Sequence, residues 1–148
     1  KDIKKELHRE KDGTFTLLEE FNDELKIQQP KTNRFKGKVY FLIDGRSGSA
    51  TAEFTAVAHS NHLGVFIGEE TGGAYEGGNG GSFLHFELPH SKISIQSPLI
   101  CYENAVHDPR VKGRGTIPDH DVPWKLNDAL NAVDTQLEFV LDLISSKQ

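Results

Sequence analysis

The spacing of apolar residues predicts a strand, a helix and a second strand in the middle of the chain. Residues 39–43 form a continuous apolar run, which is typical of a strand buried on both faces. Residues 49–61 are predicted to form a helix, and residues 63–68 are a second apolar run. The predicted buried side of the helix carries Phe54, Val57 and Ala58. This order predicts a parallel sheet with a right-handed crossover, and ligand sites in such sheets lie beyond the carboxyl ends of the strands.

The segments that follow predict a loop, a hairpin and a polar connection. Residues 69–81 contain six glycines, and so few side chains predict a mobile surface loop. Residues 83–88 and 93–96 flank a short polar turn, which indicates a β-hairpin. Residues 104–121 have the composition of a long polar loop.

The two ends of the chain differ in how strongly they are patterned. Near the C-terminus, apolar residues recur at helical spacing at Leu137, Val140, Leu141 and Ile144. Thr135 and Glu138 have the spacing of a capping box at the start of this predicted helix. Residues 1–34 are polar and weakly patterned, and we interpret them as part of the same domain as residues 35–148.

Composition and charge exclude several classes of function. The chain has 148 residues, of which 36% are hydrophobic and 26% charged, and this is ordinary for one globular domain. A net charge of -5, with basic residues interleaved among acids, argues against a nucleic-acid surface. No apolar run approaches the roughly 18 to 20 residues of a membrane span. The single cysteine, Cys101, excludes an internal disulfide, and its apolar neighbours predict a buried strand position.

Ser49 lies where the first predicted strand turns into the helix, and this is a suitable place for a nucleophile. The free N–H groups of the first helical turn, including that of Ala50, would face negative charge that develops beside its hydroxyl. Two other interpretations stay open. Ser49 could simply cap the helix, and Ser47 could be the nucleophile, because residues 45–49 nearly match the G-x-S-x-G turn of α/β-hydrolases.

Neither a metal nor a cofactor is predicted. His59 and His62 have a spacing that suits a metal, but no third ligand accompanies them in the sequence. The glycine-rich segment lacks both the G-K-[ST] of a P-loop and the G-x-G-x-x-G of a dinucleotide site.

Four ordered motifs resemble those of the tail-specific (C-terminal-processing) serine peptidases. Residues 47–51 (Ser-Gly-Ser-Ala-Thr) are similar to the family's nucleophile motif, and residues 67–73 are similar to its G-E-x-T-x-G segment. Residues 113–122 resemble the closing G-x-x-P-D-x-x-V, and residues 134–138 resemble the D-x-Q-L-E that opens the last helix. Gly68 follows Ser49 by nineteen positions, as in the family, so the resemblance selects Ser49 over Ser47.

The resemblance implies an α/β fold of the ClpP/crotonase-like type, built from repeated β-β-α units with a mostly parallel sheet. It implies a serine peptidase that hydrolyses extended or C-terminal protein segments, with Ser49 as nucleophile and the Ala50 N–H in the oxyanion hole. Residues 35–148 would be the C-terminal portion of the peptidase core domain. The family is commonly exported, so a periplasmic or cell-surface location is expected, with protein or peptide substrates as partners.

The chain departs from the family at the general base. Many members carry a lysine shortly after G-E-x-T-x-G, and Ala74 stands at that position here. The family's D-x-R-x-N-x-G-G stretch, which supplies a second oxyanion N–H, would lie upstream of Lys1, so we expect this chain alone to be inactive. The alternative function is a non-catalytic peptide- or lipid-binding module on the same scaffold, similar to retinoid-binding repeats.

Overall fold

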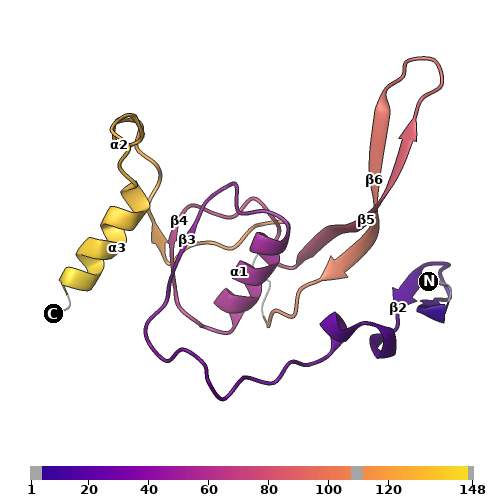
Figure 1. Ribbon diagram of the computed structural model, residues 1–148, viewed down its shortest axis with the longest axis horizontal. Helices are drawn as coiled ribbons and strands as arrows, with labels where there is room; N and C mark the ends of the chain where they lie inside the picture. Colours follow the sequence, from indigo (N-terminus) through magenta and orange to yellow (C-terminus); the bar gives the residue numbers. More distant parts are fainter. Residues whose placement is uncertain (1–4, 108–111, 147–148) are drawn as a thin grey trace. The chain divides into compact units, whose positions relative to one another are not determined.

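A computed structural model describes residues 5–107 and 112–146 of the chain (Figure 1). The chain forms two compact units, Lys1–Gly37 and Lys38–Gln148. Parts of the predicted N-terminal segment, of the predicted 104–121 loop and of the C-terminus lie outside the described residues. Within the described part, no helix is both long enough and apolar enough to cross a membrane.

The first unit is a short hairpin followed by two helical turns. Strand β1 (Leu7–Arg9) pairs antiparallel with β2 (Phe15–Leu17). The 3-10 turns η2 (Glu19–Phe21) and η3 (Asp23–Leu25) follow. No residue of η2 is buried, so nothing packs this segment into a longer helix.

The second unit contains the predicted strand, helix and strand. Strand β3 (Tyr40–Ile43), helix α1 (Ala50–Ser60) and strand β4 (Val65–Gly68) follow one another, and β3 pairs parallel with β4. Strand β7 (His120–Asp121) adds a third parallel strand beside β4, so the sheet order is β3-β4-β7. The fold is therefore mixed α/β with a parallel sheet. Strand β7 corrects the prediction that residues 104–121 are loop throughout.

The core between α1 and the sheet is small and tightly closed. Ile43, Ala58 and Phe66 are at most 2% exposed, and the ring of Phe41 stacks on that of Phe66 with centroids 4.6 Å apart. The prediction that Phe54 faces the core is wrong, because its side chain is 59% exposed. The prediction is confirmed for Ala58. The buried face of α1 carries small side chains, which allow the helix to lie close to the sheet; they are Ala52, Thr55, Ala56 and Ala58.

Strand β3 is likewise buried on one face more than on the other. Leu42 is 40% exposed, so the prediction of a strand buried on both faces is wrong at this position. A continuous apolar run does not by itself show that both faces are covered.

A long hairpin follows β4. Strand β5 (Gly77–Glu87) pairs antiparallel with β6 (Ser94–Glu103), which confirms the predicted hairpin and lengthens both of its strands. The predicted mobile loop at residues 69–81 is wrong for its second half, because residues 77–81 belong to β5. The glycines of this stretch can form a strand because strand pairing depends on backbone hydrogen bonds. At position 77 only glycine fits, because the backbone of Tyr102 leaves no room for a Cβ.

Cys101 lies on strand β6, as predicted, but it is exposed. The prediction of a buried cysteine is therefore wrong. Its apolar neighbour Leu99 is also 63% exposed, because β6 belongs to a two-stranded hairpin.

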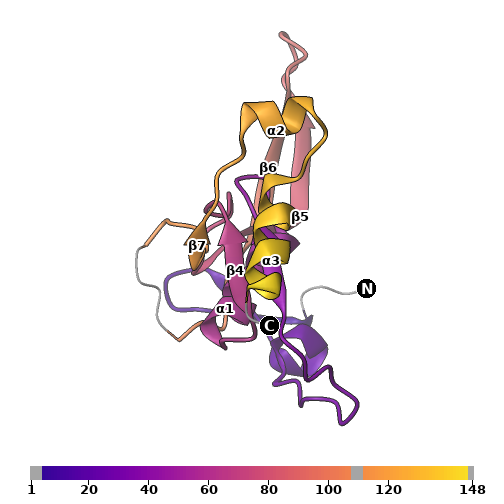
Figure 2. The same cartoon turned by 90° about the vertical axis from the view of Figure 1, so that its left-hand side faces the viewer.

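Two helices close the chain. Helix α2 (Leu126–Leu130) is short, and α3 (Thr135–Ser145) runs alongside strand β4 in Figure 2. The side chain of Asp134 accepts hydrogen bonds from the N–H groups of Gln136 and Leu137, so Asp134 caps α3 in place of the predicted box at Thr135 and Glu138. The side chains of the predicted apolar face are mostly exposed to solvent. Among its residues only Val140 is buried, whereas Leu137, Leu141 and Ile144 are 39–48% exposed.

Candidate active site

Ser49 occupies the turn between β3 and α1 in a conformation that L-residues rarely adopt. Its backbone angles are φ 52° and ψ -133°, and its side chain makes no capping hydrogen bond. Such a backbone costs about 1–3 kcal/mol and recurs at functional sites. The interpretation of Ser49 as a helix cap is therefore wrong, because the hydroxyl does not serve that purpose. An exposed hydroxyl on a strained turn is instead available for chemistry.

Ser47, the competing serine, is part of the turn itself. Its hydroxyl accepts a hydrogen bond from the Asp44 N–H at 3.2 Å, and its own N–H donates to the Asp44 carbonyl at 2.9 Å. The Asp44 carboxylate also accepts from the Arg46 N–H at 2.8 Å. Ser47 is half-buried and holds the turn closed, so the geometry favours Ser49 as the reactive hydroxyl.

The first turn of α1 places backbone N–H groups next to Ser49. Ala50 is the first residue of the helix, and the N–H groups of a first helical turn have few intrahelical acceptors. The Thr51 N–H donates to the Gly48 carbonyl at 3.2 Å, and the Glu53 N–H donates to the Ser49 carbonyl at 3.1 Å. The positive end of the helix therefore lies at the serine and favours negative charge there.

The segment after β4 packs against this turn. The Gly73 N–H donates to the Ser47 carbonyl at 3.4 Å. A Cβ on Gly73 would collide with the Cβ of Ala52 and would lie 3.7 Å from the backbone nitrogen of Ser49. Glycine at position 73 therefore lets the two segments meet closely.

Glu70, which belongs to this segment, forms a polar network with Arg114 and Gly115 that could not be predicted from the sequence. The Glu70 carboxylate accepts two hydrogen bonds from the Arg114 guanidinium, and it also accepts one from the Gly115 N–H at 2.8 Å. The hydrogen bonds from Arg114, and then that from Gly115, lower the pKa of Glu70 to about 2. Glu70 and Arg114 are 44 positions apart, so no local pattern could have paired them.

A cleft of about 520 Å³ opens at the carboxyl ends of the parallel strands. Gly45 follows β3, Glu69 follows β4 and Asp121 ends β7, and all three line the cleft. Glu70, Arg114, Ile117 and Pro118 complete its lining. This is the edge of a parallel sheet where ligand sites are expected, and the Ser49 turn starts at the same strand end.

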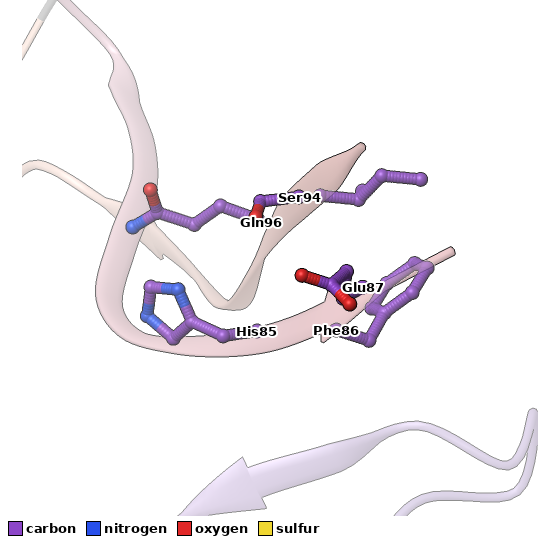
Figure 3. Close-up of a pocket in the computed structure, with 6 residues that line it drawn as sticks. His85, Phe86, Glu87, Ser94 and Gln96 are labelled. Carbon is purple, nitrogen blue, oxygen red and sulfur yellow. The ribbon is translucent and has the colours of Figure 1, made fainter. Parts of the chain in front are cut away.

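Two further hollows are lined by other residues than those at the carboxyl ends of the three parallel strands. One, of about 420 Å³, lies on the hairpin, where His85 faces Gln96 and Glu87 faces Ser94 (Figure 3). The other, of about 130 Å³, is lined in part by His59, Tyr75 and Asp119.

His59 on α1 and His62 just after it, which have a spacing that suits a metal, lie in different surroundings. The His59 ring contacts Tyr75, with its Nδ1 3.1 Å from the phenol oxygen, whereas His62 is exposed. Among the described residues, no group of three or more His, Cys, Asp or Glu side chains is arranged to hold a metal ion.

One of the comparisons with known proteins identifies a family. The chain matches Peptidase family S41 over residues 3–122. None of the curated proteins searched matches the chain. Residues 3–122 include the Ser49 turn, the segment after β4 and the cleft-lining residues, so most of the chain is covered. The protein therefore belongs to Peptidase family S41, the tail-specific (C-terminal-processing) peptidase family, and this membership implies a peptidase.

Proposed function

We propose that the protein is a serine peptidase in which Ser49 is the nucleophile. The observation that carries this proposal is the Ser49 backbone at φ 52°, ψ -133°, with a hydroxyl that caps nothing. The Ser49 oxygen would attack the carbonyl carbon of a peptide bond, and its proton would pass through a base to the departing amine nitrogen. Water would then hydrolyse the acyl-enzyme ester and regenerate the serine.

The oxyanion of the tetrahedral intermediate would be held by the Ala50 N–H at the start of α1. One lost oxyanion donor costs roughly 3–4 kcal/mol of transition-state stabilisation in a characterised serine peptidase. The positive end of helix α1 adds a favourable field at the same point.

The residue at the position of the family's lysine cannot be the base of this mechanism. Ala74, at the position of the family's lysine, is half-buried and carries no titratable group. We therefore propose that the base comes from outside the described residues, and that this chain by itself has little activity.

The substrate we propose is an extended or C-terminal segment of a protein. The cleft at the ends of β3, β4 and β7 has a volume of about 520 Å³, which is enough for part of a peptide, and Gly45, at the start of the turn that leads to Ser49, lines it. We further propose a ClpP/crotonase-like scaffold and an exported location, on the basis of the family resemblance.

A second candidate function is a binding module without proteolysis. Ala74 in place of a lysine favours it, because a serine without a base is a poor nucleophile at neutral pH. On this alternative the cleft would bind a peptide or a lipid and release it unchanged.

The experiment is cleavage of an unstructured reporter protein by the full-length protein, with Ser49→Ala and Ser47→Ala as matched variants. We expect loss of cleavage only in Ser49→Ala. Loss only in Ser47→Ala would refute Ser49 as the nucleophile, and a wild-type protein that binds the reporter without cleaving it would favour the binding module.

A further inference from the structure

Residues 69–75 lie between two segments that are distant in sequence. On one side, the Gly73 N–H donates to the Ser47 carbonyl, and the backbone of Gly72 approaches the Gly45 carbonyl so closely that a Cβ would collide with it. This side of the segment is therefore in direct contact with the nucleophile turn. If this segment moved, the nucleophile turn would lose its contacts with Gly72 and Gly73.

On the other side, the same segment is bonded to residues 114–116. The Thr71 N–H donates to the Thr116 carbonyl at 3.1 Å, and the Thr116 N–H donates back to the Thr71 hydroxyl at 2.7 Å. The Tyr75 N–H donates to the Arg114 carbonyl at 2.7 Å. The Thr71 hydroxyl also donates to the Gly73 carbonyl at 3.1 Å, so this network reaches the residue that touches the turn.

The charged end of this network is the ion pair of Glu70 and Arg114. The Glu70 carboxylate accepts from the Arg114 Nε at 2.7 Å and from a second guanidinium nitrogen, which is the fork geometry of a strong pair. It also fixes the Gly115 N–H, at a position where a Cβ would collide with the Thr71 carbonyl.

We propose that Glu70, through Arg114 and Gly115, is a positioning residue that holds the nucleophile turn in its strained conformation. This inference rests on the proposed function of Ser49. The strained backbone of Ser49 persists only if contacts with the surrounding structure hold it in that conformation. Residues 114–116, about 44 positions further along the chain, are bonded to Glu70 and Thr71, and the Thr71 hydroxyl is bonded to Gly73, so these contacts supply that constraint.

Glu70→Gln is the informative variant, because it keeps the shape and removes the charge. An amide NH₂ cannot accept a hydrogen bond, so Arg114 loses at least one acceptor. Gly115 loses its acceptor as well if the NH₂ replaces the oxygen that it shares with the Arg114 Nε. Glu70→Asp keeps the charge on a shorter side chain and serves as the conservative variant. Glu87→Gln is the matched control, since Glu87 pairs with Lys92 at 3.2 Å on the hairpin, away from the turn.

The first readout is covalent labelling of Ser49 by a fluorophosphonate in the full-length protein. In Glu70→Gln we expect the maximal labelling rate to fall about 10- to 100-fold, with the concentration dependence of labelling unchanged, because the serine is misplaced while the cleft remains. Glu70→Asp should recover part of the rate, and Glu87→Gln should label like the wild type. Wild-type labelling kinetics in Glu70→Gln would overturn the proposal.

The second readout does not depend on reactivity. Hydrogen exchange of the Gly73 amide should become about tenfold faster in Glu70→Gln and stay unchanged in Glu87→Gln. If the wild type is not labelled at Ser49, the proposed function fails, and Gly73 exchange still decides whether Glu70 positions the turn. If Glu70→Gln does not fold, Arg114→Lys keeps the charge but loses the fork and gives the same test. Unchanged exchange in a folded variant overturns the proposal.

Discussion

Replacing Ser49 by glycine should make the protein more stable than the wild type. Glycine adopts φ 52°, ψ -133° without strain, which relieves about 1–3 kcal/mol. Glycine also has a larger conformational entropy in the unfolded chain, and this offsets about 0.5–1 kcal/mol. The serine side chain makes no capping hydrogen bond that would be lost. The expected net gain in the free energy of unfolding is therefore between roughly 0 and 2.5 kcal/mol.

Ser49→Ala separates this explanation from ordinary helix capping. Alanine keeps the strain and loses no hydrogen bond, so its stability should equal that of the wild type within a few tenths of a kcal/mol. If Ser49 were a helix cap, alanine would cost about 1 kcal/mol and glycine a few tenths, and both variants would be less stable than the wild type.

The assay is urea unfolding followed by the fluorescence of Trp124, the single tryptophan, which lies in the second unit. Ser47→Ala is the control. It should lose about 0.5–1.5 kcal/mol, because its hydroxyl accepts from the Asp44 N–H. A Ser49→Gly variant less stable than the wild type would refute the reasoning from strain.

Three further predictions concern the support of the site. Gly73→Ala should destabilise the protein by about 1–3 kcal/mol and slow Ser49 labelling, because the new Cβ collides with Ala52, whereas Gly80→Ala, with open space around its Cβ, should not slow labelling. The pKa of Glu70 is lowered from 4.5 to about 2, so the stability that its ionised carboxylate contributes is fully present above pH 4.5 and is lost as the pH falls toward 2. The free energies of unfolding of the wild type and of Glu70→Gln, measured at a series of acidic pH values, should therefore converge over that range. Asp134→Ala should cost about 1 kcal/mol in urea unfolding, since it removes the acceptor for two N–H groups of α3, and an unchanged midpoint would contradict that role.

The elements with a strong local pattern could be predicted from the sequence. The apolar runs around β3 and β4 and the helix between them specify the parallel pair, because each is readable within its own few residues. The position of Ser49 in the turn between this strand and this helix followed from the same pattern. The hairpin was also predictable, since its two strands flank a short polar turn.

Features that depend on distant contacts could not be predicted. Strand β7 has two residues, and its pairing with β4 joins positions more than fifty residues apart. The ion pair of Glu70 and Arg114 joins two segments that carry no shared local signal. The burial of α1 was predicted correctly at Ala58 and wrongly at Phe54, which has the hydrophobicity of a core residue but is 59% exposed, because the buried face of this helix carries small side chains.

The central claim is that Ser49 is the nucleophile of a peptidase. The most direct test is mass spectrometry of the full-length protein after treatment with a fluorophosphonate, which locates the modified residue. The account predicts one phosphonyl group on the peptide that contains residues 47–51, located at Ser49 by fragmentation and absent in Ser49→Ala. Modification at Ser47, or none in a folded protein that cleaves peptides, would contradict it.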